Sequence, residues 1–453
     1  MSKPTPLSGF PELLPAERNA ELYVLDHLRR VFELHGFASV ETRVAEPMDQ
    51  LLRKGEIDKE VYVLRRLQSD DPDADAGLGL HYDLTVPFAR YVLENAGKLD
   101  FPFRRYQIQK AWRGERPQEG RFREFTQADI DIVAKDELPF HFDVEVARVM
   151  VEALSGLPVP ALRLQVNNRK LLEGFYLGLG VSDTAAVMRI VDKLDKLPAD
   201  KIAELLRSDA GLSTEQAEQC LALAQISAPD DSFVDRVRAL GVEHELLETG
   251  LDELSQVVGA ITRQGASNVT VTADLRIARG LDYYTGTVFE TQMAGFEHLG
   301  SICSGGRYDE LANDGKNTYP GVGISLGVSR ILVPLMARGA LTSSRSVPSC
   351  VLVALVDEQS RDQSNDVAQS LRARGIPTEV APAPQKFGKQ IRYAERRGIP
   401  YVWFPANGEV PDQVKDIRDG TQDDADTGTW MPPASDLTPQ IHTSADETQG
   451  VTQ

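Results

Sequence analysis

Apolar residues near the start of the chain recur at the spacing of a helix. They predict a helix over residues 16–36, on the positions Leu22, Leu25, Leu28 and Phe32. Residues 37–42 then alternate between apolar and polar side chains and predict a strand. The acidic, glycine-containing stretch 70–79 is typical of a hairpin tip or loop.

Two longer alternating stretches, residues 103–113 and 122–133, flank a segment that has no hydrophobic periodicity. That segment, residues 114–120, contains Pro and Gly. Strand, long loop and strand in this order predict an antiparallel pair. Residues 141–155 return to helical spacing, so we expect a helix after the second strand.

Between residues 168 and 265 the apolar positions keep helical spacing with little sign of strands, which indicates an inserted helical module. Strand patterns return in the stretches 269–275, 286–292 and 300–303. A run of small residues from Gly321 then predicts a buried strand that enters a helix over 327–338. Helices beside a mostly antiparallel sheet predict an α+β core.

The chain changes character again after residues 339–348, a stretch rich in Ser, Gly and Pro that predicts a linker. Strands are then expected at 351–355, 378–380 and 401–404, and helices at 359–374 and 385–397. Their alternation predicts a small α/β domain. From Val410 onward there are nine acidic and two basic residues, and we expect a disordered tail over 434–453.

These changes divide the 453 residues into six segments. They are a first part of the core (1–167), the helical insertion (168–265), a second part of the core (266–338), the linker (339–348), the α/β domain (349–433) and the tail (434–453).

The composition is that of a globular protein, with 42% hydrophobic and 26% charged residues. No apolar run approaches the roughly 20 residues that span a bilayer, and the N-terminus has no apolar signal core, so we expect a cytoplasmic protein.

The cysteines at 220, 303 and 350 lie far apart without zinc-site spacing, and we expect no protein metal site. The formal charge of -19 argues against a general nucleic-acid coat protein, but it allows local basic patches or a salt-tolerant host.

One segment runs against this acidic background. From Phe101 to Phe125 there are seven Arg or Lys residues and three Glu, together with aromatic residues and glycines. Such a concentration of positive charge suits a polyanion, and a solvated charged face explains it about equally well. Arginines near glycine or an aromatic residue recur at Arg113, Arg121, Arg123, Arg279 and Arg330. Each one alone is more often a surface ion pair, so their joint occurrence carries the argument.

Three smaller motifs are each open to a structural and a functional interpretation. Tyr283 and Tyr284 point to opposite faces of a predicted strand, where one could pack in the core. Gly305-Gly306 before Tyr308 would admit a ligand to the backbone or would only make a turn. Gln127 and Asp131 share one face of a strand. With Asp83-Leu84-Thr85 they could hold an ammonium group or simply be solvated.

Taken in order, these segments resemble the signature motifs of class II aminoacyl-tRNA synthetases, and specifically the histidyl-tRNA synthetase family. Residues 104–131 resemble motif 2, residues 321–332 resemble motif 3, and residues 279–284 with 304–309 resemble the histidine-specific signature. The resemblance covers residues 7–405. It implies a class II antiparallel sheet core flanked by helices, a helical insertion and a C-terminal anticodon-binding domain. The branch that residues 80–87 resemble usually has Arg at the position of His81.

The resemblance also implies a role for single residues. Arg113 and Arg279 would be catalytic, because both would meet charge on the α-phosphate of ATP. ATP would be bound by Arg113, Glu115, Arg121, Phe125 and Arg330, with adenine between Phe125 and Arg330. Histidine would be bound by Asp83, Leu84, Thr85, Arg113, Gln127, Asp131, Arg279, Tyr283, Tyr284 and Tyr308. Within that set, Asp131 and Tyr284 would recognise the two imidazole nitrogens.

The implied reaction is the ATP-dependent attachment of L-histidine to tRNA(His) by a homodimer, with Mg²⁺ held largely by the phosphates. Arg116 would approach the acceptor stem. The basic residues Lys386, Lys389, Arg392, Arg396 and Arg397 fall at helical spacing and would contact tRNA, or they would form an ordinary solvated face.

Two non-enzymatic alternatives resemble the same core. The regulatory subunit of ATP phosphoribosyltransferase usually lacks the C-terminal domain and part of the arginine set, whereas this chain has both. A synthetase-like domain that senses uncharged tRNA normally accompanies an effector domain, for which we see no segment. Both comparisons favour the synthetase.

Overall fold

The computed structural model describes residues 4–52, 60–68, 77–277, 284–408 and 410–443. Two compact units make up the chain, one formed by residues 1–11 and 25–334 and the other by 12–24 and 335–453. None of the helices in the described ranges is long and apolar enough to cross a bilayer.

A nine-stranded sheet organises the first unit, with the strand order β1-β5-β6-β12-β11-β10-β7-β9-β8. Its strands are β1 (Ala38–Ser39), β5 (Phe103–Trp112), β6 (Glu124–Val133), β7 (Leu162–Asn168), β8 (Ser227–Ala228), β9 (Val269–Asp274), β10 (Tyr284–Met293), β11 (Cys303–Tyr308) and β12 (Gly321–Gly327). Neighbouring strands are antiparallel, except that β1 pairs with β5 and β7 pairs with β9 in parallel. The sheet is therefore the antiparallel core that the sequence predicts.

The helices of this unit are α1 (Pro15–Leu34, whose first residues belong to the second unit), α2 (Met48–Leu51), α3 (Thr85–Asn95), α4 (His141–Ser155), α5 (Arg169–Gly178), α6 (Thr184–Val191), α7 (Ala199–Ser208), α8 (Thr214–Ala224), α9 (Phe233–Arg238), α10 (Glu245–Gln264) and α11 (Val328–Ala337). Short 3-10 turns are η2 (Ala96–Lys98), η3 (Asp192–Asp195) and η4 (Glu297–Leu299). A small sheet joins β2 (Ala45–Pro47), β4 (Leu78–Leu80) and β3 (Val63–Leu64).

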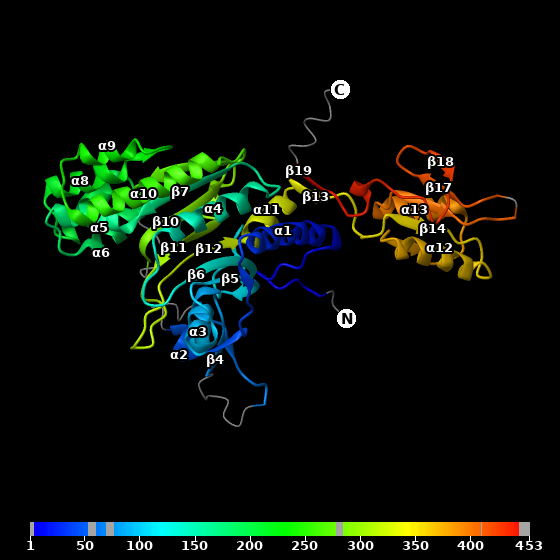
Figure 1. Cartoon of the computed structure of the whole chain (residues 1–453), viewed down its shortest axis with the longest axis horizontal. Helices are drawn as coiled ribbons and strands as arrows, with labels where there is room; N and C mark the ends of the chain where they lie inside the picture. Colours follow the sequence, from blue (N-terminus) through cyan, green and yellow to red (C-terminus); the bar gives the residue numbers. More distant parts are fainter. Residues whose placement is uncertain (1–3, 53–59, 69–76, 278–283, 409, 444–453) are drawn as a thin grey trace. The chain divides into compact units, whose positions relative to one another are not determined.

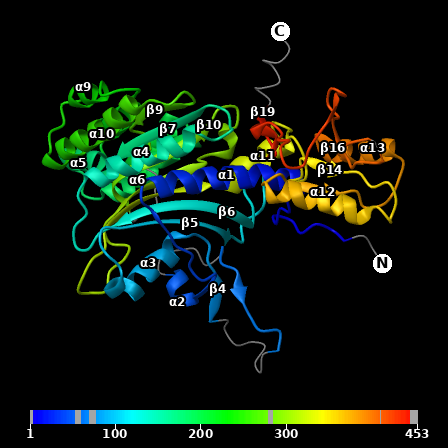
Figure 2. The same ribbon diagram turned by 45° about the vertical axis from the view of Figure 1, so that its right-hand side comes forward.

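The two faces of the large sheet carry different residues. Figure 2 shows α4 on one side of the sheet, and α2 and α3 on the other. Ala128, Ile130 and Ile132 of β6 are buried on the α4 side, as alternation requires. Arg105 of β5 lies under the Phe88 ring of α3, with 4.2 Å from its guanidinium carbon to the ring centroid. The α3 side therefore carries the polar positions of the strands.

A buried ion pair fixes α3 against the small sheet. The Glu46 carboxylate is fully buried and accepts two hydrogen bonds from Arg90 Nε and one from its Nη2, at 2.8–3.0 Å. A pair of this kind costs several kcal/mol to break, because either partner alone would be an uncompensated buried charge. The start of α3, where Asp83, Leu84 and Thr85 lie, is held in place through this contact.

The second unit contains a five-stranded sheet of order β15-β14-β16-β17-β18. Its strands are β14 (Val351–Val353), β15 (Thr378–Val380), β16 (Tyr401–Phe404), β17 (Gln413–Asp416) and β18 (Gln422–Asp424), and its helices are α12 (Arg361–Ala373), α13 (Phe387–Arg397) and the turn η5 (Ala434–Asp436). Figure 1 shows β14 between α12 and α13. The three parallel strands β14, β15 and β16 confirm the predicted α/β pattern.

Most predicted elements of the core are confirmed, and two strand boundaries are wrong. The predicted strand over 37–42 shrinks to the two residues of β1. The strand expected at 300–303 begins only at Cys303, because η4 and the positive φ of Gly300 turn the chain before it. Gly305 and Gly306 consequently lie inside β11 rather than in a turn.

The predicted linker and the start of the predicted tail also need correction, because they pair with each other. Leu341–Ser343 forms β13 and pairs antiparallel with Ile441–Thr443, which forms β19. Asp436 is buried, where it accepts a hydrogen bond from the Tyr401 hydroxyl (2.7 Å) and two from Arg418 (2.9 and 3.0 Å). Composition suggested disorder from 434, but these contacts order residues 434–443; residues 444–453 lie outside the described ranges.

Replacing Asp436 by Ala should lower the free energy of unfolding of the second unit by about 1–3 kcal/mol, because the Tyr401 hydroxyl would lose its buried acceptor. Thermal unfolding followed by tryptophan fluorescence measures this, since Trp403 and Trp430 pack in this unit. Deleting residues 444–453 serves as the control and should leave the transition unchanged. An unchanged transition in Asp436→Ala would contradict the assigned contact.

Candidate active site

Four side chains of β6 form the floor of a polar site on the α3 side of the sheet. Phe125, Gln127, Asp129 and Asp131 are two residues apart and therefore share a face. Their cross-strand neighbours continue the floor, with Arg105 opposite Asp131 on β5 and Ser325 opposite Asp129 on β12. The prediction that Gln127 and Asp131 lie on one face is confirmed by this register.

A cavity of about 110 Å³ opens over one end of this floor. Its lining contains all five residues of the predicted ATP set together with Gln127 of the predicted histidine set: Arg113, Glu115, Arg121, Phe125, Arg330 and Gln127. These residues come from β6, the loop before it and α11, which are far apart in the sequence. The fold therefore brings the predicted set together.

Glu115 bridges two of the arginines. Its carboxylate lies 3.8 Å from Arg113 Nη1 and 3.3 Å from Arg121 Nη1. Arg113 Nε also donates to the Tyr82 carbonyl at 3.0 Å, and its guanidinium carbon lies 5.1 Å from the centroid of the Phe125 ring. These contacts hold Arg113 over an aromatic ring and Arg121 beside the same carboxylate, which suits an anion joined to a planar group.

Arg330 closes the cavity from α11. Its Nε donates to the Gly120 carbonyl at 3.0 Å, and its Nη1 donates to the Ser301 carbonyl at 2.7 Å. Burial, followed by the nearby charges of Arg121 and Arg113, lowers the pKa of Arg330 to about 10. The side chain remains a cation at neutral pH, and an anion bound nearby would offset the repulsion among these three arginines.

The far end of the floor holds Asp131 between a cation and a hydroxyl. Arg105, which is fully buried, pairs with Asp131 Oδ2 at 2.6 Å, and the Tyr308 hydroxyl donates to Oδ1 at 2.7 Å. An adjacent guanidinium favours the charged form of a carboxylate. Asp131 is thereby prepared to accept a hydrogen bond from a ligand.

Glycines make room for this arrangement. A Cβ atom at Gly323 would lie 2.2 Å from Asp131 Oδ1, and one at Gly306 would lie 3.0 Å from the nearest atom of the Tyr284 ring. Gly305 and Gly306 therefore serve close packing within β11, where Gly306 leaves room for the tyrosine ring, rather than the turn that was one of the two predicted interpretations. Tyr284 itself lies half-buried opposite Tyr308.

The segment before α3 lies beside this end of the floor. Asp83 Oδ1 accepts from the Val86 backbone N–H at 3.0 Å, and Leu84 is fully buried with its carbonyl 3.4 Å from Arg105 Nη2. Thr85 is the first residue of α3. His81 is buried beneath them, its ring nitrogens 3.2 Å and 2.7 Å from the Arg43 and Lys110 carbonyls, so it ties this segment to β5.

Asp129 is the residue of the floor that sequence analysis passed over. It is 2% exposed, and no hydrogen-bond partner of its Oδ1 is found in the part of the chain that the structure describes. Burial raises its pKa to about 7, Arg105 and the Ser325 hydroxyl lower it, and Asp131 and Asp83 raise it. The alternation of side chains along a strand, which placed Gln127 and Asp131 on one face, places Asp129 on that face as well.

Arg105 was also missed, since it was counted only as part of the charge run. The segment 101–125 is no simple solvated face, because Arg105 lies fully buried within it. Two other predicted residues, Arg279 and Tyr283, lie outside the described ranges.

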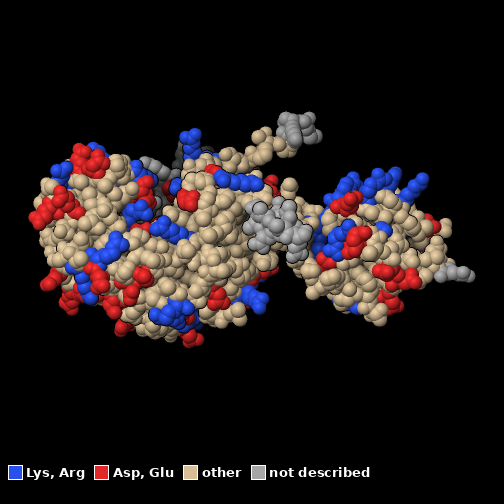
Figure 3. All heavy atoms as spheres, turned by 90° about the horizontal axis from the view of Figure 1, so that it is seen from above, with Lys and Arg blue, Asp and Glu red and all other residues tan. Residues whose placement is uncertain are grey.

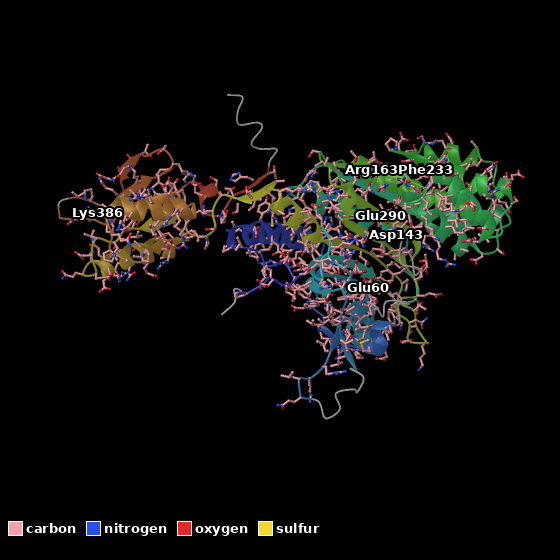
Figure 4. The ribbon with its side chains drawn as sticks, turned by 180° about the vertical axis from the view of Figure 1, so that it is seen from behind. Glu60, Asp143, Arg163, Phe233, Glu290 and Lys386 are labelled. Atoms are coloured by element: carbon pink, nitrogen blue, oxygen red, sulfur yellow. The ribbon has the colours of Figure 1, made fainter. Side chains whose placement is uncertain are left out.

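Arg116 lies apart from the cavity, on the surface of the loop between β5 and β6. It is exposed and lines an open hollow with Glu60, Pro117, Gln118, Glu115 and Arg121. Figure 4 shows Glu60 in this part of the first unit. The hollow shares Glu115 and Arg121 with the cavity. An extended ligand that lies along the loop would therefore reach the same two residues as a ligand in the cavity.

In the second unit, a basic surface follows α13. Lys386, Lys389, Arg392 and Arg396 are exposed, and the last three line a hollow of about 390 Å³. Figure 3 shows Lys and Arg gathered along one edge of this unit, and Figure 4 shows Lys386 at its surface. Arg397 was predicted with these basic residues, but its side chain pairs with Glu379 at 3.4 Å.

Comparison with known proteins agrees with this geometry. The family model described as histidyl-tRNA synthetase matches residues 9–331, and the model described as anticodon binding domain matches residues 349–425. A histidine–tRNA ligase of Cutibacterium acnes is 58% identical over 97% of this chain and 99% of the relative. One of Micrococcus luteus is 56% identical over 98% and 100%. The crystal structure of histidyl-tRNA synthetase from Nostoc sp. PCC 7120 is 33% identical, with a TM-score of 0.82 over 93% of this chain and 96% of that one.

Gly323→Ala should lower the free energy of unfolding of the first unit by about 1–3 kcal/mol, because its methyl group would overlap Asp131 and the Ile130 carbonyl. Chemical denaturation measures the change. Gly97→Ala is the matched control, since a Cβ there meets nothing within 4 Å and should change stability by less than about 0.5 kcal/mol. Equal stability of the two variants would show that the site does not require the close approach.

Proposed function

The chain belongs to the histidyl-tRNA synthetase family, and we propose which of its residues bind each substrate and which act on the reacting groups. Histidine–tRNA ligases attach L-histidine to tRNA for translation, and this is the activity of the chain. ATP is the second substrate that the family implies. The proposal concerns which side chains hold each substrate.

The observation that carries the assignment is the order of residues along one face of β6. Phe125 and the arginines lie at one end, Gln127 lies next, and Asp131 lies at the other end. A nucleotide at the first end and an imidazole at the other would bring the α-phosphate and the amino-acid carboxylate together between them. Holding the two reacting groups next to each other lowers the activation barrier, because the entropy of bringing them together is lost on binding.

In the first step the histidine carboxylate would attack the α-phosphate of ATP, giving histidyl-adenylate and pyrophosphate. Arg113 would contact both anions, because its guanidinium already lies beside Phe125 and Glu115. Arg279 would stabilise the charge that develops on the α-phosphate. Arg121 would hold the outer phosphates, and adenine would lie between Phe125 and Arg330, with Glu115 accepting from its amino group.

At the other end, Asp131 and Tyr284 would recognise the imidazole, while Tyr283 and Tyr308 would complete the pocket. Asp131 accepts from the imidazole N–H, and a tyrosine hydroxyl donates to the bare nitrogen. Asp83, Leu84, Thr85 and Gln127 would surround the ammonium group. An amino acid that lacks either ring nitrogen would leave a buried group unpaired, which supports discrimination of about 10⁴-fold.

In the second step the terminal adenosine of tRNA(His) would attack the adenylate carbonyl. Arg116 lies on the exposed loop beside the cavity, where it would meet the acceptor end. The basic surface of α13 would contact the anticodon arm through phosphates, because exposed Lys and Arg supply affinity of this kind. The anticodon-domain match supports that assignment, and it disfavours the regulatory-subunit alternative, which usually lacks this domain.

Three further properties follow from the family rather than from the geometry. Mg²⁺ would accompany ATP and be held largely by phosphate oxygens. Within the described ranges no group of three His, Cys, Asp or Glu residues could hold a metal ion by itself, and we assign no protein ligand. We also propose a homodimer that works in the cytoplasm.

The purified protein should exchange labelled pyrophosphate into ATP in the presence of histidine and not with the other standard amino acids. Exchange requires adenylate formation but no tRNA, so it tests the first step alone. Binding of histidine or tRNA without any exchange would overturn the enzymatic assignment and favour a sensing or regulatory protein.

Tyr308→Phe should raise the KM for histidine by roughly tenfold or more, because Asp131 would lose a charge-assisted hydrogen bond that orients it. The KM for ATP should not change. Pyrophosphate exchange measured against each substrate separates the two effects. Tyr319→Phe is the matched control, since Tyr319 packs in the same apolar cluster without contacting Asp131 in the described structure. An equal rise in both Michaelis constants would contradict the role of Tyr308.

A further inference from the structure

Asp129 occupies the middle of the site floor, and the assignments above leave it without a function. It lies between Gln127 and Asp131 on the same face of β6. Strand geometry places it roughly 7 Å along the strand from each neighbour. A histidine whose ammonium group is bound by Gln127 and whose ring is bound by Asp131 would therefore lie between these two side chains, next to Asp129.

Two adjacent acceptors on this face are buried and unsatisfied. Asp129 Oδ1 and Gln127 Oε1 have no hydrogen-bond partner in the described ranges, although these residues are only 2% and 7% exposed. Leaving such groups unpaired costs free energy, so two of them side by side in the floor of a site call for an explanation. A ligand with several N–H donors would satisfy both acceptors at once.

The charges around Asp129 favour a cationic ligand over a neutral one. Arg105 of β5 faces it but is already paired with Asp131 at 2.6 Å. Asp131 on the same strand and Asp83 before α3 add negative charge, and Cys303 lies on β11 nearby. The Ser325 hydroxyl of β12 donates to Asp129. An added positive charge would be attracted by all three carboxylates.

We propose that Asp129 binds the α-ammonium group of histidine together with Gln127, and that histidine binding expels a proton from the Asp129 carboxyl group. This inference rests on the proposed function of the site. The expelled proton passes to the solvent, and the carboxylate left behind accepts from the ammonium N–H. No bond other than O–H is broken.

The direction of the pH dependence follows from the environment of Asp129. In the empty site burial raises the pKa of this carboxyl to about 7, so its protonated form persists close to neutral pH. An ammonium group in contact favours the charged form and lowers the pKa. Affinity for histidine should therefore increase as the pH rises towards 7, and it should fall by up to tenfold per unit below that value.

Isothermal titration calorimetry at pH 7 in phosphate and in Tris measures the proton directly, because the two buffers differ in ionisation enthalpy. The ligand is 1,2,4-triazolylalanine, whose ring does not protonate in this range and so contributes no proton of its own. The full-length protein should release a measurable fraction of a proton on binding. Asp129→Asn should release none, and its affinity should be roughly ten- to a hundredfold weaker.

Asp143→Asn provides the matched control. Asp143 is also buried, has a pKa raised first of all by burial, and has an unpartnered Oδ1 in the described structure. It pairs at 2.9 Å with Arg307 of β11, whose side chain points away from the site. Proton release should persist in this variant, which separates loss of a site carboxyl from loss of any buried carboxyl.

The absence of proton release in the unaltered protein would overturn the proposal, and so would undiminished release in Asp129→Asn. If Asp129→Asn fails to fold, the unaltered protein still tests the proposal. Its affinity for the triazolylalanine ligand must rise between pH 5.5 and 7. Histidine-dependent pyrophosphate exchange is measured on the same preparation. Exchange without proton release refutes only the role of Asp129, whereas absence of exchange refutes the proposed function.

Discussion

The register of β6 fixes the hydrophobic core of the first unit and the floor of its site at the same time. Its even-numbered residues, Ala128, Ile130 and Ile132, are buried against helices, and its odd-numbered residues form the floor of the site. A shift of one residue against either neighbouring strand would exchange these two sets. The same hydrogen bonds that pair β6 with β5 and β12 therefore determine both the stability of the core and the position of the residues in the floor of the site.

The polar side of this strand is costly to fold, and the structure offsets the cost by pairing. Arg105 is fully buried, which would be prohibitive without Asp131, and Asp131 in turn is hydrogen-bonded by Tyr308. Gly323 removes the side chain that would collide with this carboxylate. The buried ion pair of Glu46 and Arg90 performs a similar task for the segment that begins α3. Gln127 Oε1 and Asp129 Oδ1, which have no hydrogen-bond partner in the described ranges, are consistent with a floor that a ligand completes.

Periodicity was sufficient to predict the elements that build the site but not the contacts between them. The alternation over 103–113 and 122–133 predicted β5 and β6, and the face shared by Gln127 and Asp131 followed from it. The pairing of Arg105 with Asp131 could not be predicted, because it depends on which residue of β5 lies opposite which residue of β6. Long-range pairing also explains the errors at 339–348 and 434–443, whose compositions suggest a linker and a disordered tail although the two segments form β13 and β19 together. Composition reports how a segment behaves alone and carries no information about a partner a hundred residues away.

A crystal structure of the protein with histidine and a non-hydrolysable ATP analogue would show whether one strand face orders both substrates. We expect adenine against Phe125, the amino-acid carboxylate at Arg113, the ammonium group over Gln127 and Asp129, and the imidazole at Asp131, in that sequence along β6. Histidine bound in the reverse direction, or an imidazole held away from Asp131, would contradict this order.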